Sequence, residues 1–421
     1  MKVRSTSHLP ERHDDNDDQV LRSNFSNSQA KTGTRAILIT YPEEFVKVEA
    51  VGLVEAAGYS IAQVITTKRL SHPQYAVGSG KAEEIRNIAE DMKTEMIIVD
   101  DRLSSSQAHN LAKFTHQQVI DRERLILDIF DKRATTTEAK LQVRLAELKY
   151  EIPRAREAVR LSLKGEQAGF MGMGEYAVDI KFRALKRQMS LVQKKLDQAS
   201  KRRELFRSSR DRLSLPLVSL AGYTSSGKTT LFNRFVSEHK EESPNLFTTL
   251  TTTTRGFEPL SGRKVLLSDT VGFISRLPTY MIEAFKSTLE ELAYADLILL
   301  LVDASENTND METKYVSCRR VLEQLHINPA RLCVVLNKVD VASREDLPER
   351  VALIGDVPSI LVSARTGEGI KKLRIMMVET VFGLPVQSAP QTDDLAGHSK
   401  KREDRMESVK PSHGLENLDY L

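Results

Sequence analysis

The chain has 421 residues, of which 40% are hydrophobic and 28% are charged. These fractions exclude a wholly disordered chain and, with this length, predict two or three globular domains. The 61 Lys and Arg residues nearly balance the 58 Asp and Glu residues, so that the net charge is only +3. Taken over the whole chain, this balance argues against a nucleic-acid-binding protein unless the charge is distributed unevenly.

Two features bear on the cellular compartment. Cys318 and Cys333 are too few for a disulfide scaffold or a cysteine-based metal site, and both lie in apolar patterns that predict buried thiols. No apolar run approaches the roughly 18 residues of a membrane span. The first residues lack the apolar segment of a secretory signal. We therefore expect a cytoplasmic location.

Residues 1–35 are polar and predict a tail without a packed core. Over residues 36–130, short apolar runs alternate with helical patterns. This alternation predicts an α/β domain with a parallel sheet covered on both faces. The turn at Gly78-Ser-Gly80-Lys81 is interpreted as an ordinary strand–helix connection, because it lacks the full spacing of a phosphate-binding loop. In the first helix, from residue 44, the spacing places on one face Phe45, Val48, Val51 and Leu53 or Val54.

Residues 131–213 predict an antiparallel helical hairpin; the alternative is two helices packed on a larger core. Apolar residues recur at steps of three and four, at Leu141, Leu145, Leu148 and Ile152 and again at Phe182, Leu185, Met189, Val192, Leu196 and Ala199. Pro153 is expected to kink or interrupt the first helix. No regular helix is expected to cross the tip, because it contains Gly165, Gly169, Gly172 and Gly174.

The charge of this hairpin is not balanced. Residues 131–214 contain 21 basic and 11 acidic residues, a net charge of +10, and residues 181–213 contain 12 basic and 3 acidic residues. Clustered positive charge attracts polyanions such as RNA. The predicted RNA contacts are basic residues of the second helix, namely Lys186, Arg187, Lys194, Lys195, Lys201, Arg202 and Arg203.

A further domain is predicted over residues 214–385, followed by a second polar tail over 386–421. The first strand pattern of the domain at 214–385 leads into a G-x-x-x-x-G-K-[ST] motif and then into a helix pattern. This is the context of a phosphate-binding loop. Backbone N–H groups of such a loop point at phosphate oxygens. The Lys228 ammonium is expected to contact the β- and γ-phosphates, and the Thr229 hydroxyl to ligate Mg²⁺. The loop comprises Gly222, Tyr223, Thr224, Ser225, Ser226, Gly227, Lys228, Thr229 and Thr230.

Three later motifs, each at the end of a strand pattern, identify the nucleotide as GTP. The first is Asp269, Thr270, Val271 and Gly272, in which Asp269 is expected to hold Mg²⁺ through water and the Gly272 N–H to sense the γ-phosphate. The second is Asn337, Lys338, Val339 and Asp340, whose carboxylate accepts two hydrogen bonds from guanine but not from adenine. The third is Ser363, Ala364 and Arg365, where a backbone N–H can meet the guanine carbonyl oxygen.

Between the first and second motifs, a threonine-rich stretch follows Phe247 and predicts a switch loop that ligates Mg²⁺ when the γ-phosphate is present. The chemistry leaves open which threonine does so, among Thr248, Thr249 and Thr251 to Thr254. Phe273 stands where small GTPases often have a glutamine that orients the attacking water. Because a phenyl ring cannot hydrogen-bond this water, we expect slow intrinsic hydrolysis that a partner accelerates.

Taken together, these residues resemble the HflX family of ribosome-associated GTPases, in the Obg–HflX superfamily of the translation-factor-related class. The resemblance covers about residues 36–385. It rests on VGSGKAEEI (77–85), IIVDDRLSSSQAHNL (97–111), VIDRERLILDIFDKRATTTEAKLQVRLAEL (119–148), GYTSSGKTTL (222–231), DTVGFISRLP (269–278) and AFKSTLEE (284–291).

The resemblance implies an N-terminal HflX domain, a helical hairpin and a Ras-like GTPase domain. It also implies binding to the large ribosomal subunit and its rRNA, splitting or rescue of stalled ribosomes, and stimulation of the GTPase by the ribosome. The family's Phe-Ala-Thr-Leu-Asp switch pattern falls on Phe247, Thr248, Thr249, Leu250 and Thr251, so the Mg²⁺ role passes to Thr249. We expect a monomer.

The sequence departs from the family pattern at three places. Thr251 replaces the aspartate of the switch loop, and Ser225 replaces an asparagine that ligates K⁺ in related GTPases. The tip reads Gly172-Met-Gly174-Glu175-Tyr176, which is similar to archaeal members. Two other functions remain open at this point: a GTP-dependent ribosome- or RNA-binding module with negligible turnover, and an RNA-remodelling ATPase.

Overall fold

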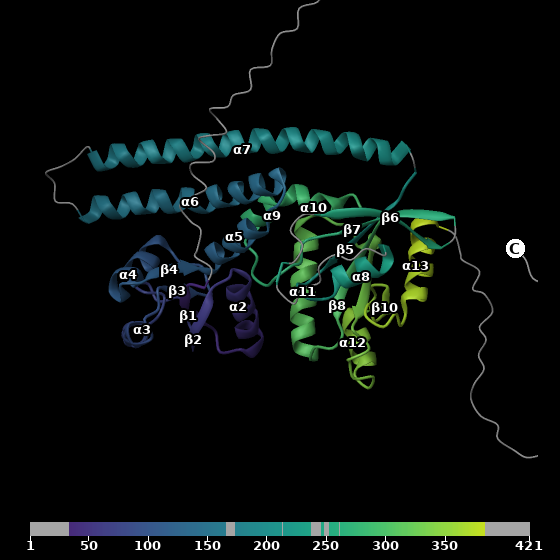
Figure 1. Cartoon of the computed structure of the whole chain (residues 1–421), viewed down its shortest axis with the longest axis horizontal. Coiled ribbons are helices and arrows are strands. Elements are labelled where there is room, and N and C mark those ends of the chain that lie inside the picture. Colours follow the sequence, from purple (N-terminus) through teal and green to yellow (C-terminus); the bar gives the residue numbers. More distant parts are fainter. Residues whose placement is uncertain are drawn as a thin grey trace, which may run out of the picture. The chain divides into compact units, whose positions relative to one another are not determined.

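The structure, a computed structural model, describes residues 33–165, 173–212, 214–236, 246–247, 252–260 and 262–383. Figure 1 shows two α/β regions and a pair of long helices. Among the described residues, no helix is both long and apolar enough to cross a membrane.

The first region is built on a four-stranded parallel sheet, as the sequence predicts. The strand order is β2-β1-β3-β4. The strands are β1 (Arg35–Thr40), β2 (Ser60–Thr66), β3 (Met96–Val99) and β4 (Gln118–Asp121). The helices are α2 (Glu44–Ala56), α3 (Ser79–Met92), α4 (Ser105–Thr115) and α5 (Arg122–Arg133).

Both faces of this sheet are covered. Because successive strand residues point to opposite faces, Ile37 and Ile39 pack with the α3–α4 side, whereas Ala36 and Leu38 pack with the α2–α5 side. The face that the helical spacing assigns to α2 is buried only in part: Phe45 and Val51 are partly buried, whereas Val48 is 61% exposed. It lies about 200° around the helix from buried Ala50, and therefore faces away from the sheet.

The two long helices are α6 (Thr137–Gly165) and α7 (Met173–Arg212), and they pack along each other as the predicted antiparallel hairpin (Figure 1). The two apolar stripes form their seam, with Leu145, Leu148 and Val192 buried. Pro153 lies within α6, so that of the two expected outcomes, a kink or an interruption, the interruption does not occur; a helix held by packing tolerates one missing N–H donor. Residues 166–172 of the tip lie outside the described residues, and Gly174 is already within α7.

The second region is a six-stranded sheet of order β10-β9-β8-β5-β7-β6, parallel except for β6, which is antiparallel to β7. Its strands are β5 (Leu217–Gly222), β6 (Thr253–Leu260), β7 (Arg263–Asp269), β8 (Leu297–Asp303), β9 (Leu332–Asn337) and β10 (Ser359–Leu361). Its helices are α8 (Lys228–Val236), α9 (Thr279–Ala284), α10 (Lys286–Ala293), α11 (Thr308–Gln324), α12 (Leu347–Ile354) and α13 (Ile370–Phe382).

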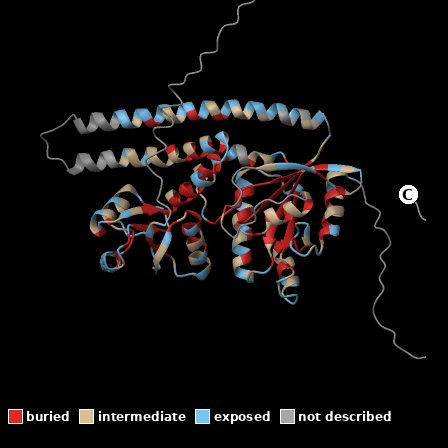
Figure 2. Cartoon of the chain, in the orientation of Figure 1, coloured by how far each residue is buried: buried red, intermediate tan, exposed pale blue. Residues whose placement is uncertain are grey.

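The central strands of this sheet are buried on both faces (Figure 2). Continuous apolar runs such as residues 297–302 are typical of a parallel sheet between two helix layers. Cys318 and Cys333 are free and buried, as predicted. The chain therefore has the predicted fold class: a parallel-sheet α/β domain, a helical hairpin and a P-loop domain.

Candidate nucleotide-binding and hydrolysis site

The loop between β5 and α8 has the backbone of a phosphate cradle. Gly222 and Gly227 have φ angles of +144° and +93°, which L side chains rarely adopt. A Cβ on Gly222 would collide with the carbonyl oxygen of Leu301, and one on Gly227 with the side-chain amide of Asn337. Only glycine fits at these two positions, so the loop closes tightly around the N-terminus of α8.

Lys228 lies at the first turn of α8 and is 7% exposed. Its ammonium donates to the carbonyl oxygens of Gly222 (3.0 Å) and Tyr223 (2.6 Å). Burial lowers the pKa of Lys228 to about 8, and the nearby carboxylate of Asp269 opposes this shift. Because burial disfavours the charged form of Lys228, a bound phosphate would stabilise its ammonium.

The chemistry of the donor set here suits Mg²⁺. The hydroxyl of Thr229 lies 3.3 Å from a carboxylate oxygen of Asp269, which is fully buried at the end of β7. Hydroxyl and carboxylate oxygens are the hard ligands that Mg²⁺ prefers. The third predicted ligand, Thr249, lies outside the described residues, as do Thr248, Leu250 and Thr251.

The segment after Asp269 runs against the phosphate loop. Phe273 N donates to Gly222 O at 3.0 Å, and Thr224 N donates to Phe273 O at 2.8 Å. A Cβ on Gly272 would lie 3.1 Å from the Lys228 ammonium, so the Gly272 backbone borders the predicted phosphate position. The Phe273 ring is 1% exposed, within the core, and offers no group to a water molecule.

The predicted base-binding motifs meet at the ends of β9 and β10. Ser363 Oγ donates to one carboxylate oxygen of Asp340 at 2.7 Å, and Arg365 pairs with the other at 2.7 Å. The Ser363 bond is the main cause of a lowered pKa of Asp340, which keeps this carboxylate ionised as an acceptor. A cavity of ≈ 210 Å³ adjoins these groups and is lined by Gly227, Thr230, Asn337, Lys338, Asp340, Val341, Ala364 and Arg365.

Asn337 ties the two ends of the site together. Its amide donates to Ser226 O at 2.9 Å, and its oxygen accepts from Ala364 N at 2.9 Å. Arg234 of α8, which no sequence pattern predicted to belong to the site, donates to the carbonyl oxygens of Ala364 (2.7 Å) and Arg365 (2.9 Å). No motif marks Arg234, because its partners are backbone atoms about 130 residues away.

Phe247, predicted in the switch loop, is 2% exposed and has a φ angle of +58°. Its ring lies 4.8 Å from that of Phe130 of α5, in an edge-to-face arrangement. The residue at which the predicted switch loop begins is therefore anchored on the N-terminal domain.

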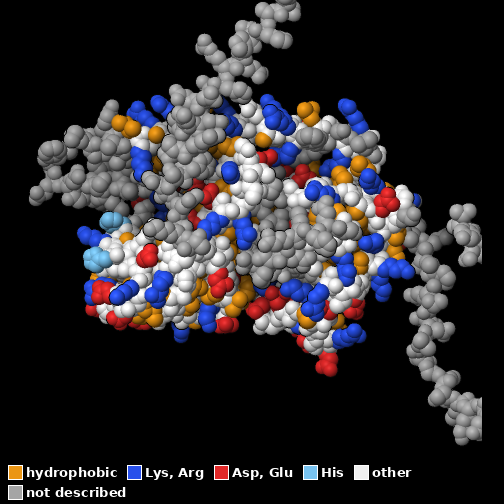
Figure 3. All heavy atoms as spheres, viewed as in Figure 1, with side chains coloured by type: hydrophobic (Ala, Val, Ile, Leu, Met, Phe, Trp, Pro, Cys, Tyr) orange, Lys and Arg blue, Asp and Glu red, His pale blue; other side chains and the backbone are white. Residues whose placement is uncertain are grey.

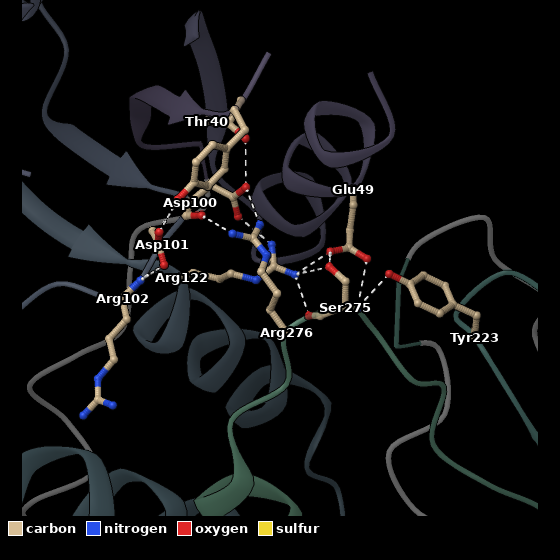
Figure 4. A network of polar contacts seen from close by, with 10 residues as sticks. Thr40, Glu49, Asp100, Asp101, Arg102, Arg122, Tyr223, Ser275 and Arg276 are labelled. Atoms are coloured by element: carbon tan, nitrogen blue, oxygen red, sulfur yellow. Dashed lines mark hydrogen bonds and ion pairs between the residues drawn. The ribbon is translucent and has the colours of Figure 1, made fainter. Parts of the chain in front are cut away.

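A buried polar network links the segment after Gly272 to the N-terminal domain (Figure 4). Arg122 donates to Asp100 at 2.5 Å, pairs with Glu49, and donates to Ser275 O at 2.9 Å. Arg276 adds a second cation, 2.9 Å from Asp100. Although burial would lower the pKa of Arg122, the carboxylates of Asp100 and Glu49 outweigh burial and raise it. Sequence reasoning missed this network; the DRERL stretch that contains Arg122 was its only signal.

A phosphate-loop motif, the buried Asp269 and the Asn-Lys-x-Asp motif that ends in Asp340, all at the carboxyl ends of one largely parallel sheet, are the arrangement of a P-loop GTPase. Three family models match consecutive parts of the chain. They are described as GTP-binding GTPase N-terminal (residues 47–131), GTP-binding GTPase middle region (133–210) and 50S ribosome-binding GTPase (217–338).

Curated relatives align with this chain over most of their own length. A protein named GTPase HflX from Thermococcus kodakarensis is 38% identical, covering 82% of this chain and 80% of its own length. A protein of the same name from Methanocaldococcus jannaschii is 42% identical, covering 76% of this chain and 79% of its own length. Another from Escherichia coli is 34% identical, covering 85% of this chain and 84% of its own length. The chain therefore belongs to the HflX family of GTPases and is a GTP hydrolase.

Proposed function

We propose that this GTPase acts on the large ribosomal subunit in the cytoplasm, in ribosome splitting, rescue or quality control, and binds rRNA through α7. The observation that carries this proposal is the charge of the exposed face of α7. Five of the predicted RNA contacts are exposed there: Lys186, Arg187, Lys194, Lys201 and Arg202. Lys and Arg side chains project along this helix in Figure 3. Salt-dependent neutralisation of phosphates by such residues dominates RNA affinity.

The other two predicted contacts have a different environment. Lys195 is only partly exposed, and Arg203 pairs with Glu138 of α6 and lies 3.9 Å from Glu290 of α10. We assign Arg203 to holding the hairpin on the GTPase domain, and restrict the proposed RNA surface to the five exposed residues. The match to a family described as 50S ribosome-binding GTPase supports the same partner.

In the proposed site, Lys228 binds the β- and γ-phosphates, the Gly272 N–H faces the γ-phosphate, and Asp340 with the Ala364 N–H reads guanine. Thr229 and Asp269, the latter through water, would hold Mg²⁺ together with Thr249. The ion would neutralise charge that develops on the phosphate oxygens. Adenine would offer the Asp340 carboxylate neither of the two N–H donors that guanine presents, at a cost of about 1–3 kcal/mol, which corresponds to a roughly 5- to 150-fold preference for GTP.

The buried Phe273 supports the second part of the proposal, a low intrinsic rate that the ribosome raises. In GTPases of this class, groups supplied by a partner raise the rate by large factors. The experiment measures GTP and ATP hydrolysis with and without purified large ribosomal subunits. We expect the subunits to stimulate the hydrolysis of GTP but not that of ATP. GTP-dependent ribosome binding without stimulation would instead favour a binding module, and ATP turnover that survives Asp340→Ala would favour an ATPase.

A further inference from the structure

We infer that Tyr223 is a positioning residue for GTP hydrolysis, whose phenol oxygen fixes the backbone that follows Gly272 against the phosphate loop. Ser275 N donates to Tyr223 Oη at 2.7 Å, across 52 residues of sequence. Figure 4 shows Tyr223 approaching Ser275 from the side opposite to the Arg276–Asp100 pair. The inference deepens the proposed GTPase site and rests on it.

The position of this backbone is unusually important here because Phe273 is buried in the core. In place of a glutamine side chain, this segment can offer to the γ-phosphate and the attacking water the backbone groups on either side of Phe273, whose own N–H and C=O pair with the phosphate loop. The position of a water or phosphate that backbone groups bind depends on the position of the backbone. A small displacement of the backbone therefore lowers the rate of hydrolysis by a large factor.

Three hydrogen bonds between described residues hold the segment to the phosphate loop. Two are backbone–backbone bonds, Phe273 N to Gly222 O and Thr224 N to Phe273 O. The third, from Ser275 N to Tyr223 Oη, ends on a side chain, so a single atom can be removed without altering the main chain. Tyr223 thus holds the segment at both ends: its loop pairs with Phe273, and its hydroxyl holds Ser275 two residues further on.

The phenol is itself held in place. Tyr223 is 5% exposed, its ring centroid lies 6.4 Å from that of Phe45 of α2, and the Lys314 ammonium lies 5.3 Å from the centroid. Ser275 N also lies 3.2 Å from a carboxylate oxygen of Glu49. In Tyr223→Phe the ring keeps its packing and Ser275 N keeps Glu49 as an acceptor, so this variant isolates the positioning effect of the hydroxyl.

The test compares intrinsic GTP hydrolysis by the full-length wild type and Tyr223→Phe, without ribosomes. We expect kcat to fall roughly three- to tenfold, the effect of one lost hydrogen bond, with KM and GDP affinity within about twofold of wild type. Affinity for GDP with aluminium fluoride, which mimics the transition state, should fall in parallel with kcat. The matched control is Tyr315→Phe, at a tyrosine of α11 that is 7% exposed and whose hydroxyl accepts from Arg319; we expect it to leave kcat unchanged.

An unchanged or increased kcat in Tyr223→Phe would overturn the inference. A loss of GDP affinity as large as the loss in kcat would also overturn it, since this result would mean that the hydroxyl only supports the phosphate loop. The Tyr223→Phe comparison is independent of the ribosome proposal, because it measures the rate of GTP hydrolysis without ribosomes. A wild type that the large subunit fails to stimulate would refute that proposal and leave this comparison intact.

Discussion

Nη1 of Arg122 lies 2.5 Å from a carboxylate oxygen of Asp100, and both side chains are almost completely buried. The same guanidinium reaches Glu49 and the carbonyl oxygen of Ser275, so one arginine joins two elements of the N-terminal domain to the segment after Gly272. Removing one member of such a cluster leaves buried charges without compensation.

We therefore expect Arg122→Met to lower the free energy of unfolding by about 3–5 kcal/mol. Urea unfolding followed by circular dichroism measures this change. The matched control is Arg102→Met. Arg102 also pairs with a carboxylate, that of Glu123 at 3.6 Å, but its own side chain is 72% exposed. A pair whose cation is exposed to solvent in this way is expected to contribute only about 0–1 kcal/mol. Equal effects of the two substitutions would show that the buried cluster does not stabilise the domain contact.

Charge reversal on α7 tests the proposed RNA surface. Lys201→Glu with Arg202→Glu should weaken binding to large ribosomal subunits at least tenfold and reduce the salt dependence of binding, because phosphate contacts are replaced by repulsion. Co-sedimentation over a range of salt concentrations measures both. GDP affinity should stay within about twofold, since neither residue lies near the nucleotide loop.

The matched control for this pair is Lys371→Glu with Lys372→Glu, two adjacent exposed lysines at the start of α13. It makes the same change in net charge on another helix. Equal weakening by both pairs would indicate a general charge effect and would contradict a specific role for α7.

The pKa of Lys228 gives a pH prediction. Below its pKa of about 8 the lysine of the empty site is already charged, so that nucleotide affinity is independent of this group. Above this pKa, binding phosphate requires the lysine to take up a proton, and affinity must fall as the pH rises. From about pH 7 to about pH 8.5 we expect the Kd for GDP to rise roughly three- to fivefold, measured by calorimetry.

Lys228→Arg supplies the control, because arginine remains charged throughout this range. Its affinity for GDP is expected to be lower overall but flat with pH. A wild-type affinity that is equally flat would contradict the titration of Lys228.

The Asp340 carboxylate predicts base selectivity. In Asp340→Asn one acceptor becomes a donor, so pairing with guanine is weakened and pairing with xanthine, which carries an oxygen in place of the 2-amino group, is gained. We expect GTP affinity to fall roughly 5- to 150-fold and xanthosine triphosphate affinity to rise. Asp356→Asn, at an exposed position, should change neither affinity. Retention of GTP selectivity in Asp340→Asn would remove Asp340 from base recognition.

The elements whose determinants are local in sequence were predictable. The phosphate loop is a contiguous motif, the hairpin seam follows from steps of three and four, and the parallel sheet follows from alternating strand and helix patterns. The exposure of Val48 was not predictable, because an apolar residue on a helix does not reveal which of two adjacent faces meets the sheet.

The polar network was not predictable, because its members lie far apart in the chain. Glu49 and Ser275 are separated by 226 positions, and no periodicity connects them. Arg203 illustrates the same limit: its position in a basic run predicted RNA contact, whereas its partners Glu138 and Glu290 come from two other helices. Composition reveals that charge accumulates on a segment, and only the fold reveals which charges are left facing outward.

The most direct test of the proposed function is the rate of GTP hydrolysis at saturating GTP, with and without purified large ribosomal subunits, for the wild type and the Lys201→Glu, Arg202→Glu protein. We predict that the subunits accelerate the wild type and that the charge-reversed protein loses this acceleration while keeping its intrinsic rate. A wild-type rate that the subunits leave unchanged, or an acceleration that survives the charge reversal, would contradict it.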